Sequence, residues 1–428
     1  MSITSLIFVS CFFAGLALCI FRHPMYGLYT YVAVFYLDAP SRWWEQDLPN
    51  IRWSFIAALI TLTVTLIQQD NRMDWRRHTA VLLFISYTLW MWIQSIWALS
   101  PADHSNGVTL FTKFCIVLVM VITLLDNREK LQGFLFANAI GCMYIGYLAY
   151  TSYSGGRLDG VGGSGIDDSN TLGMHMSAVV FFAAAIFMTR SKQVWLIAAA
   201  TVPLILNTIA MAGSRGALLA MVCGGLAFAF LRPQDQKKQI LFYGAIGLLA
   251  FAFLAGGDYW NRMRSISDAA TRSENMDRSA ESRFVVIEAQ LEMAKKYPLG
   301  GGHRTTAFLS YIYIPEEYQS SEGGRSSHNT FLSTLVDQGI PGLILWLMIV
   351  TRLSKYSRDV RKFSANSDSN NLCWLNAGIG AAIIVILAGG MFAPFLRAEI
   401  YVWLIACQCS IYTIAKSNTA TGVEGSSK

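Results

Sequence analysis

Uninterrupted apolar runs, separated by short polar connections, cover most of the 428 residues of this chain. Leu, Ile, Val and Ala follow one another in these runs without the strict alternation of a β-strand, which favours helices. A helix needs about 20 apolar residues to cross a bilayer. The pattern predicts transmembrane helices at 3–21, 25–37, 51–67, 79–98, 107–125, 131–152, 171–189, 194–211, 216–231, 239–255, 329–350, 372–394 and 398–415. Because the run at 25–37 is short, we expect about 12 spans in an all-α polytopic membrane protein.

The basic residues predict the orientation of these helices. If the helices simply alternate, five groups of Lys and Arg residues in the connections fall on the same side, which should be the cytoplasm. They are Arg72, Arg76, Arg77, Arg128, Lys130, Arg190, Lys192, Arg232, Lys237, Lys238, Arg352, Lys355, Arg358, Arg361 and Lys362. The other, periplasmic side then receives the connections 38–50, 99–106, 153–170, 213–216 and 256–328.

The longest of these connections divides the chain into three parts. We expect an N-terminal helix bundle at 1–255, a large periplasmic loop at 256–328, and C-terminal helices with a short tail at 329–428. Within the loop, apolar residues recur at helical spacing between Glu281 and Tyr297, and Pro298 ends the run. Such an amphipathic helix could roof a cavity between the transmembrane helices.

The composition excludes several classes of protein. Only 14% of the residues are charged, against about 25% in soluble domains. This excludes a cytosolic enzyme, a disordered chain and a nucleic-acid-binding domain, and the net charge of +6 instead reflects membrane orientation. The eight cysteines lie inside apolar runs without the spacing of a metal site or redox motif. No cofactor or metal is expected.

Three arginines on the predicted periplasmic side could bind an anion. Arg215 lies between small residues at the mouth of two apolar runs, where its guanidinium could fork onto a phosphate or carboxylate, or simply reach out to water. Arg283 opens the amphipathic helix and could present a second guanidinium, or lie on its solvated face. Arg157 lies in a glycine-rich loop that could fold over a ligand or serve only as a connector.

The residues that follow this loop have two interpretations. Asp168 and Asn170 could bind a hydroxylated substrate or a hard cation. They lead directly into an apolar run, and Asp and Asn are also common helix caps, so the capping role is favoured.

His328 is the leading candidate for proton transfer. It lies where the large loop re-enters the membrane, next to Asn329, and an imidazole can take a proton from a hydroxyl or orient it. A structural role at the helix start is the alternative. His303, followed by Arg304, is a weaker candidate of the same kind. Lys113 lies inside an apolar run. Its side chain could reach outward to water, pair with a carboxylate or contact a substrate phosphate.

Taken together, these residues indicate one type of reaction more clearly than any of them does alone. Arginines would hold a diphosphate and stabilise it as a leaving group, while His328 would handle the acceptor hydroxyl. The implied partners are an anionic lipid-linked donor and a hydroxyl acceptor in a membrane.

Two segments resemble the O-antigen ligase and polymerase superfamily. They are HNTFLSTLVDQGIPG at 328–342 and GSRGALLA at 213–220, with the largest loop between them. The chain more specifically resembles the O-glycosylation ligases found with exosortase systems. That resemblance is carried by Lys113, Gly155–Arg157, Asp168–Asn170, Tyr259–Met263, Ser282–Arg283 and Pro298–Gly302.

The resemblance implies a membrane glycosyltransferase of the GT-C type in the bacterial inner membrane. It would move a glycan from undecaprenyl diphosphate to a hydroxyl of lipid A-core or a protein on the periplasmic side, with inversion and without metal. Arg215 and Arg283 would contact the diphosphate, and His328 would activate the acceptor. A polysaccharide polymerase uses the same donor chemistry with a glycan as acceptor. A polysaccharide transporter or lipid flippase is a third possibility, although the sequence has few charges at mid-membrane.

Overall fold

The predicted apolar runs all form helices in the computed structural model. The structure describes residues 2–68, 74–163, 165–189, 195–257, 259–261, 263, 278–319, 324–365 and 370–425, and these contain helices and no strand. The apolar helices are α1 (Ile3–Phe21), α2 (Met25–Leu37), α3 (Trp53–Ile67), α4 (Thr79–Gln94), α5 (Pro101–Leu124), α6 (Arg128–Ser152), α7 (Ser169–Met188), α8 (Trp195–Ala212), α9 (Arg215–Leu231), α10 (Lys237–Leu254), α14 (Thr330–Ala365), α15 (Asn370–Gly389) and α16 (Ile400–Gly425). The all-α polytopic membrane fold is therefore confirmed.

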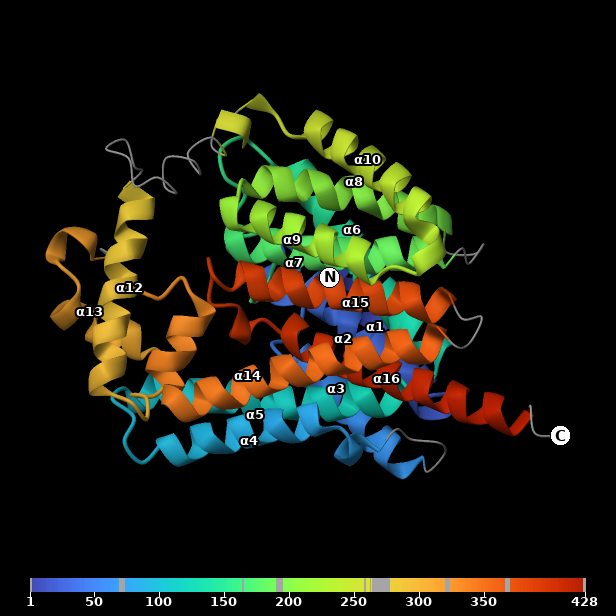
Figure 1. Cartoon of the computed structure of the whole chain (residues 1–428), viewed down its shortest axis with the longest axis horizontal. Helices are drawn as coiled ribbons and strands as arrows, with labels where there is room; N and C mark the ends of the chain where they lie inside the picture. The colour runs from blue at the N-terminus through green and yellow to red at the C-terminus, as the bar shows by residue number, and fades with distance from the viewer. Residues whose placement is uncertain are drawn as a thin grey trace.

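Seven helices in the described part of the chain are long and apolar enough to cross a membrane. Four shorter apolar helices accompany them, at Trp53–Ile67, Thr79–Gln94, Ala199–Ala212 and Arg215–Leu231. The count of about 12 spans stays a prediction. Figure 1 shows the helices lying side by side along the long axis, with α7, α8, α9 and α15 stacked above α14, α4 and α5.

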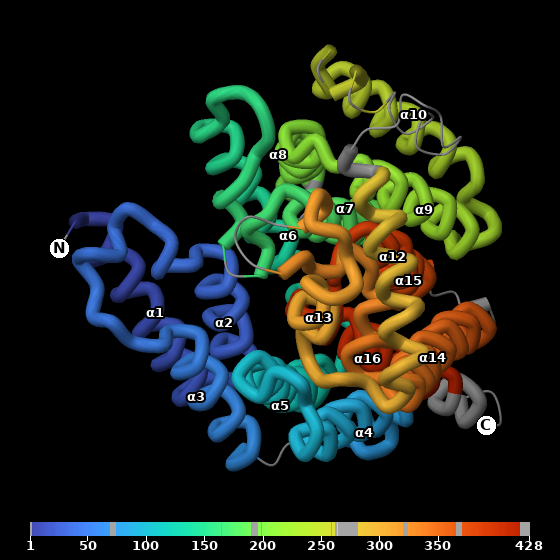
Figure 2. The backbone as a smooth tube through the Cα atoms, turned by 90° about the vertical axis from the view of Figure 1, so that its left-hand side faces the viewer, coloured from blue at the N-terminus to red at the C-terminus, as the bar shows by residue number. Residues whose placement is uncertain are grey.

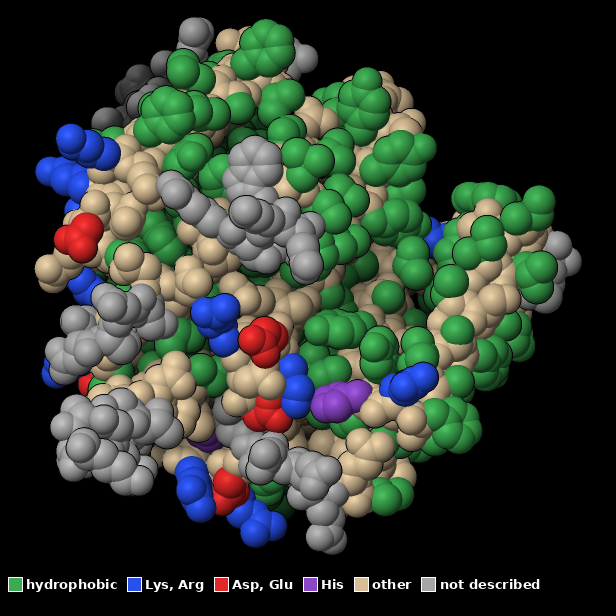
Figure 3. Space-filling view, turned by 90° about the vertical axis from the view of Figure 1, so that its right-hand side faces the viewer, with side chains coloured by type: hydrophobic (Ala, Val, Ile, Leu, Met, Phe, Trp, Pro, Cys, Tyr) green, Lys and Arg blue, Asp and Glu red, His purple; other side chains and the backbone are tan. Residues whose placement is uncertain are grey.

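The connections gather at two opposite ends of this bundle. One end, here called the loop end, carries α12 (Arg278–Lys296) and α13 (Thr305–Tyr313) and faces the viewer in Figure 2. The C-terminus lies towards the opposite end (Figure 1). Figure 3 looks onto that end, and Lys and Arg side chains are spread over it among hydrophobic ones. We call it the basic end.

Contacts at the basic end support the predicted grouping of the basic connections. The charges of Lys130 and Asp126 act on His23, so the connection between α1 and α2 adjoins the one between α5 and α6. The hydroxyl of Thr413 lies 3.2 Å from Nε2 of His78. Arg72, Arg190 and Lys192 lie outside the described residues.

Two predicted boundaries are wrong. Residues 101–106, expected in a connection, form the first turns of α5, because Pro101 stands at the first helical position and Asp103 in the first turn. These polar residues start a helix without lengthening its apolar run.

The basic residues after position 350 lie on a helix and not in a loop. The helix α14 continues to Ala365, since Leu353, Tyr356 and Val360 recur at helical spacing and are buried. Its polar last turns therefore extend beyond the apolar part that hydropathy detects.

The large loop contains the amphipathic helix that its pattern predicts, as α12, and a second helix, α13, that was not predicted. Together with α14 they bury a small core separate from that of the bundle. It consists of Val286, Ala289, Met293, Leu309, Ile314 and Val336. Side chains on α12 thus turn towards α13 and α14, which places this helical unit over the loop end of the bundle (Figure 2).

Candidate functional site

His328 lies at the centre of a cluster of charged side chains at the loop end. It is half-buried, and the charges that act on it belong to Arg283, Arg325, Asp168 and Arg157. Burial, and then the guanidinium groups of Arg283 and Arg325, lower the pKa of His328 to about 4, while the charge of Asp168 opposes them. The imidazole is therefore neutral at pH 7. Three sequence-predicted residues, from α12, the glycine-rich loop and the start of α7, thus meet around the predicted histidine.

Asn329 fixes the backbone next to His328. Its side-chain oxygen accepts hydrogen bonds from the amides of Phe331 (2.9 Å) and Leu332 (3.1 Å), which caps α14. The Thr330 amide donates to the carbonyl of Gly390 at 2.6 Å. The oxygen of Asn329, predicted to bind substrate, thus serves the helix start, and His328 precedes a well-anchored turn.

Arg325 belongs to the cluster, although the sequence analysis missed it. Its Nη2 donates to Ser282 Oγ at 2.9 Å, and its backbone amide donates to Ser310 Oγ at 3.0 Å. Both bonds join the segment before His328 to α12 and α13. The sequence feature that could have identified it is its position three residues before His328, within a polar stretch.

The N-termini of α7 and α9 lie side by side next to this cluster. Asp168 caps α7 by accepting from the amides of Asn170 (2.9 Å) and Thr171 (3.2 Å), as the favoured interpretation predicts. Ser214 caps α9 and also donates to Oδ1 of Asn170 at 2.9 Å. Arg215, the first residue of α9, is half-buried at this junction. Two helix N-termini and an arginine form a suitable environment for an anion.

The junction is tied to the segment that holds His328. A Cβ atom on Gly216 would lie 2.7 Å from Cβ of Phe392, in the connection whose Gly390 carbonyl accepts from Thr330. The starts of α9 and α14 therefore both adjoin the 390–399 connection.

The glycine-rich loop has a defined path. Its Val161 carbonyl accepts from both terminal nitrogens of Arg42, at 3.2 and 3.1 Å, and Ser169 donates its amide to Asp159 at 2.8 Å. Arg157 lines a cavity of about 650 Å³ together with Asn207 of α8, and with Tyr259. This cavity opens beside the cluster around His328.

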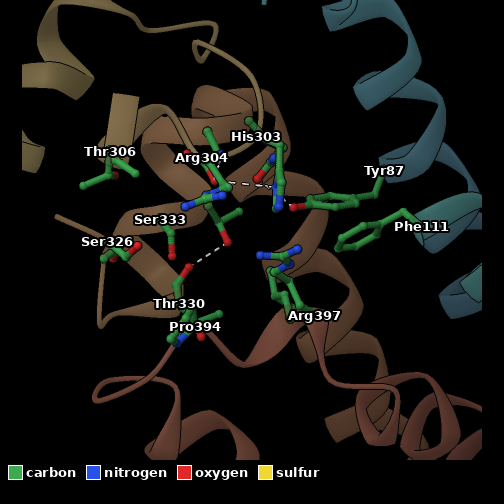
Figure 4. Close-up of a pocket in the computed structure, with 16 residues that line it drawn as sticks. Tyr87, Phe111, His303, Arg304, Thr306, Ser326, Thr330, Ser333, Pro394 and Arg397 are labelled. Atoms are coloured by element: carbon green, nitrogen blue, oxygen red, sulfur yellow. Dashed lines mark hydrogen bonds and ion pairs between the residues drawn. The ribbon is translucent and has the colours of Figure 1, made fainter. Parts of the chain in front are cut away.

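His303 and Arg304 line a different cavity, of about 100 Å³. Figure 4 shows both residues above Ser333 and Arg397, with Tyr87 and Phe111 at one side. Ser326 and Ser327, directly before His328, also line it. Burial and then the charge of Arg397 lower the pKa of His303 to about 3.

Lys113 lies apart from both cavities. It is exposed on α5 and makes no hydrogen bond or ion pair with another described residue. Within the described ranges, no group of three or more His, Cys, Asp or Glu side chains could hold a metal ion.

Comparison with known proteins identifies a family segment that contains part of this site. A family model described as "O-Antigen ligase" matches residues 199–347, which include Arg215, Arg283, His303 and His328. The chain is also 25% identical, over 348 residues, to the exopolysaccharide production protein ExoQ of Rhizobium meliloti (strain 1021). This similarity covers 77% of each chain.

Proposed function

Because the chain belongs to the O-antigen ligase and polymerase superfamily, we propose that it is a membrane glycosyltransferase of the GT-C type in a bacterial inner membrane. It transfers a saccharide from undecaprenyl diphosphate to an acceptor hydroxyl. The reaction takes place at the loop end, which faces the periplasm.

One observation carries this proposal: a neutral imidazole, His328, lies among the charges of three arginines. A diphosphate carries several negative charges, and guanidinium groups bind phosphate oxygens through paired hydrogen bonds. Burial, together with these positive charges, keeps His328 unprotonated before the donor arrives. When the diphosphate binds, its charge offsets the arginines and raises the pKa of His328, which strengthens the base at the moment it is needed.

The transfer step needs no group beyond these residues. The acceptor oxygen attacks the anomeric carbon while its proton moves to the imidazole of His328. The bond between the anomeric carbon and the diphosphate oxygen breaks, and undecaprenyl diphosphate leaves with the electron pair. A single displacement of this kind inverts the anomeric centre. Arg283, Arg157 and Arg215 stabilise the negative charge that develops on the leaving group.

We assign the donor diphosphate to the side of the cluster where Arg157 and Arg215 lie. The cavity that Arg157 lines is about 650 Å³, within the range of pockets that enclose whole small molecules. The helix N-termini of α7 and α9 adjoin it, and the positive ends of the two helix dipoles favour anions. Three guanidinium groups supply the charge that a divalent cation supplies elsewhere, so the reaction is metal-independent.

A second candidate function is polysaccharide polymerisation. The similarity to a protein named for exopolysaccharide production favours it. The donor chemistry is the same, and the acceptor is then a growing glycan in place of lipid A-core or a protein.

Mass spectrometry of the undecaprenyl-linked glycans in a deletion strain tests both. Full-length chains that accumulate on the lipid, and that the wild-type gene clears, indicate a ligase; accumulated single repeat units indicate a polymerase. His328→Ala should not clear them, whereas His23→Ala, at the basic end, should. Clearance by His328→Ala, or no accumulation at all, would contradict the proposal and return a transporter or structural role to consideration.

A further inference from the structure

The cavity of about 100 Å³ that His303 and Arg304 line is here called the Arg397 pocket. The transfer step described above does not use it. Its chemically distinctive lining residues are Tyr87, His303, Arg304, Ser333, Asp337 and Arg397. It shares no lining residue with the cavity beside Arg157. It reaches the reacting centre from another direction, through Ser326 and Ser327, which directly precede His328.

One guanidinium in the pocket has no direct hydrogen-bond or ion-pair partner. Arg304 donates to the carboxylate of Asp103 at 3.2 Å, which offsets that guanidinium. The carboxylate of Asp337 accepts from the backbone amides of Arg304 (3.1 Å) and Thr305 (3.0 Å), so it faces the start of α13. Arg397 is exposed and makes no hydrogen bond or ion pair with any described residue, and the charges of Asp337 and Asp103 act on it from a longer distance. In Figure 4 its guanidinium points up into the pocket.

His303 adds a buried acceptor to this charge. Its side chain is 8% exposed, and Nδ1 lies 3.8 Å from Oδ2 of Asp337. Its backbone amide donates to Nδ1 of His104 at 3.0 Å, which fixes the residue in place. The other ring nitrogen, Nε2, is buried without a hydrogen-bond partner among the described residues. In the tautomer that carries its proton on Nδ1, which faces Asp337, Nε2 can accept a hydrogen bond from a ligand hydroxyl.

The volume indicates what part of a ligand fits. About 100 Å³ is well below the roughly 300–1,000 Å³ of pockets that enclose whole small molecules. The pocket therefore takes one substituent of a larger molecule. A free guanidinium, a neutral imidazole acceptor and the hydroxyl of Ser333 suit a sugar substituent that carries a negative charge.

We propose that the Arg397 pocket binds an acidic substituent, a carboxylate or a phosphate, of the acceptor saccharide. This inference rests on the proposed function, since it assumes that the donor occupies the Arg157 side. It makes Arg397 a specificity residue that selects acidic acceptors. Arg397 lies beyond residues 199–347, which match the ligase family model, so the selectivity belongs to this chain's own C-terminal part.

Binding of small saccharides to the purified full-length protein in lipid nanodiscs tests the proposal. The probes are methyl β-D-glucuronide, glucose 6-phosphate and the neutral methyl β-D-glucoside. Wild type should bind at least one acidic probe about tenfold or more tightly than the neutral one, because hydrogen bonds to charged groups are the strong ones. Which acidic probe binds better identifies the carboxylate or the phosphate.

Arg397→Gln should abolish the acidic preference and leave the neutral probe unchanged. Arg52→Gln is the matched control, because Arg52 is also an exposed arginine at the loop end, next to α3. Undecaprenyl diphosphate should bind Arg397→Gln as well as wild type. An acidic preference that persists in Arg397→Gln, or is absent from wild type, overturns the proposal.

Two further outcomes separate this inference from the proposed function. Weaker binding of undecaprenyl diphosphate by Arg397→Gln would place the pocket on the donor side and overturn the acceptor assignment. Wild type that does not bind undecaprenyl diphosphate, but keeps an Arg397-dependent preference for acidic probes, would refute the proposed donor and leave the acidic-saccharide pocket supported.

Discussion

Gly300 and Gly339 lie backbone against backbone. A Cβ atom on Gly300 would stand 2.5 Å from the amide nitrogen of Gly339, and one on Gly339 would stand 2.5 Å from that of Gly300. Both residues have positive φ, 81° and 70°, and Gly339 interrupts the helical conformation of α14. The Ile340 amide donates to the carbonyl of Pro298 at 2.8 Å. Two segments of the family resemblance, Pro298–Gly302 and 328–342, thus form one joint, which is followed directly by His303 and Arg304.

Gly339→Ala should destabilise the protein by more than about 2 kcal/mol, because it adds a clash to an unfavourable φ. Thermal unfolding in detergent measures the effect. Gly247→Ala is the control: a Cβ atom on Gly247, in α10, would have no neighbouring atom within 4 Å, so alanine should be neutral or stabilising there. Equal stability of the two variants would contradict the tight joint.

The pH dependence of kcat/KM should report His328. The neutral imidazole is the active form, so activity is retained above the pKa of about 4 and falls as the pH drops through it. Arg325→Gln removes a charge that lowers this pKa, and the acid limb should therefore move to higher pH.

Ser282→Ala tests whether Arg325 acts on His328 through its charge or through the position of its loop. It removes the 2.9 Å hydrogen bond to Arg325 but keeps the guanidinium charge. The acid limb should stay near that of wild type. A shift of the same size in both variants would mean that Arg325 acts through loop position and not through charge.

Arg215→Ala should weaken the binding of undecaprenyl diphosphate about tenfold or more, because a charge-assisted contact to phosphate is lost. Titration of the protein in nanodiscs with the lipid measures this. Arg52→Ala should bind normally. Unchanged affinity in Arg215→Ala would leave this arginine as a residue that reaches out to water.

Asp168→Ala should lower stability by about 1 kcal/mol, because α7 loses its cap. Asp168→Ser restores a cap without the carboxylate, so it should recover both stability and transfer. If the serine variant is stable but inactive, the carboxylate itself contacts a substrate.

Excess EDTA should leave transfer unchanged, because guanidinium groups provide the positive charge at the leaving group. Turnover of purified protein before and after chelation gives the measurement. Activity that is lost with EDTA and restored by a divalent cation would refute the metal-independent mechanism.

Hydropathy and local residue order were enough to predict the helices and the family resemblance. Apolar runs must become helices in a bilayer, since a backbone without water has to satisfy its hydrogen bonds internally. Thirteen runs accordingly became thirteen helices, with errors where polar residues begin α5 or continue α14. The segments around Arg215 and His328 were recognisable because their residue order is local.

Which charges act together depends on how the helices pack. The sequence analysis did not single out Arg325 or Arg397, because their surroundings are set by residues far away in the sequence, such as Ser282 for one and His303 for the other. Charge interactions depend on distance and burial, which hydropathy does not encode. The close approach of Gly300 to Gly339 is equally non-local. The separation of His303 from the cluster around His328 likewise follows from how α13 and α14 pack.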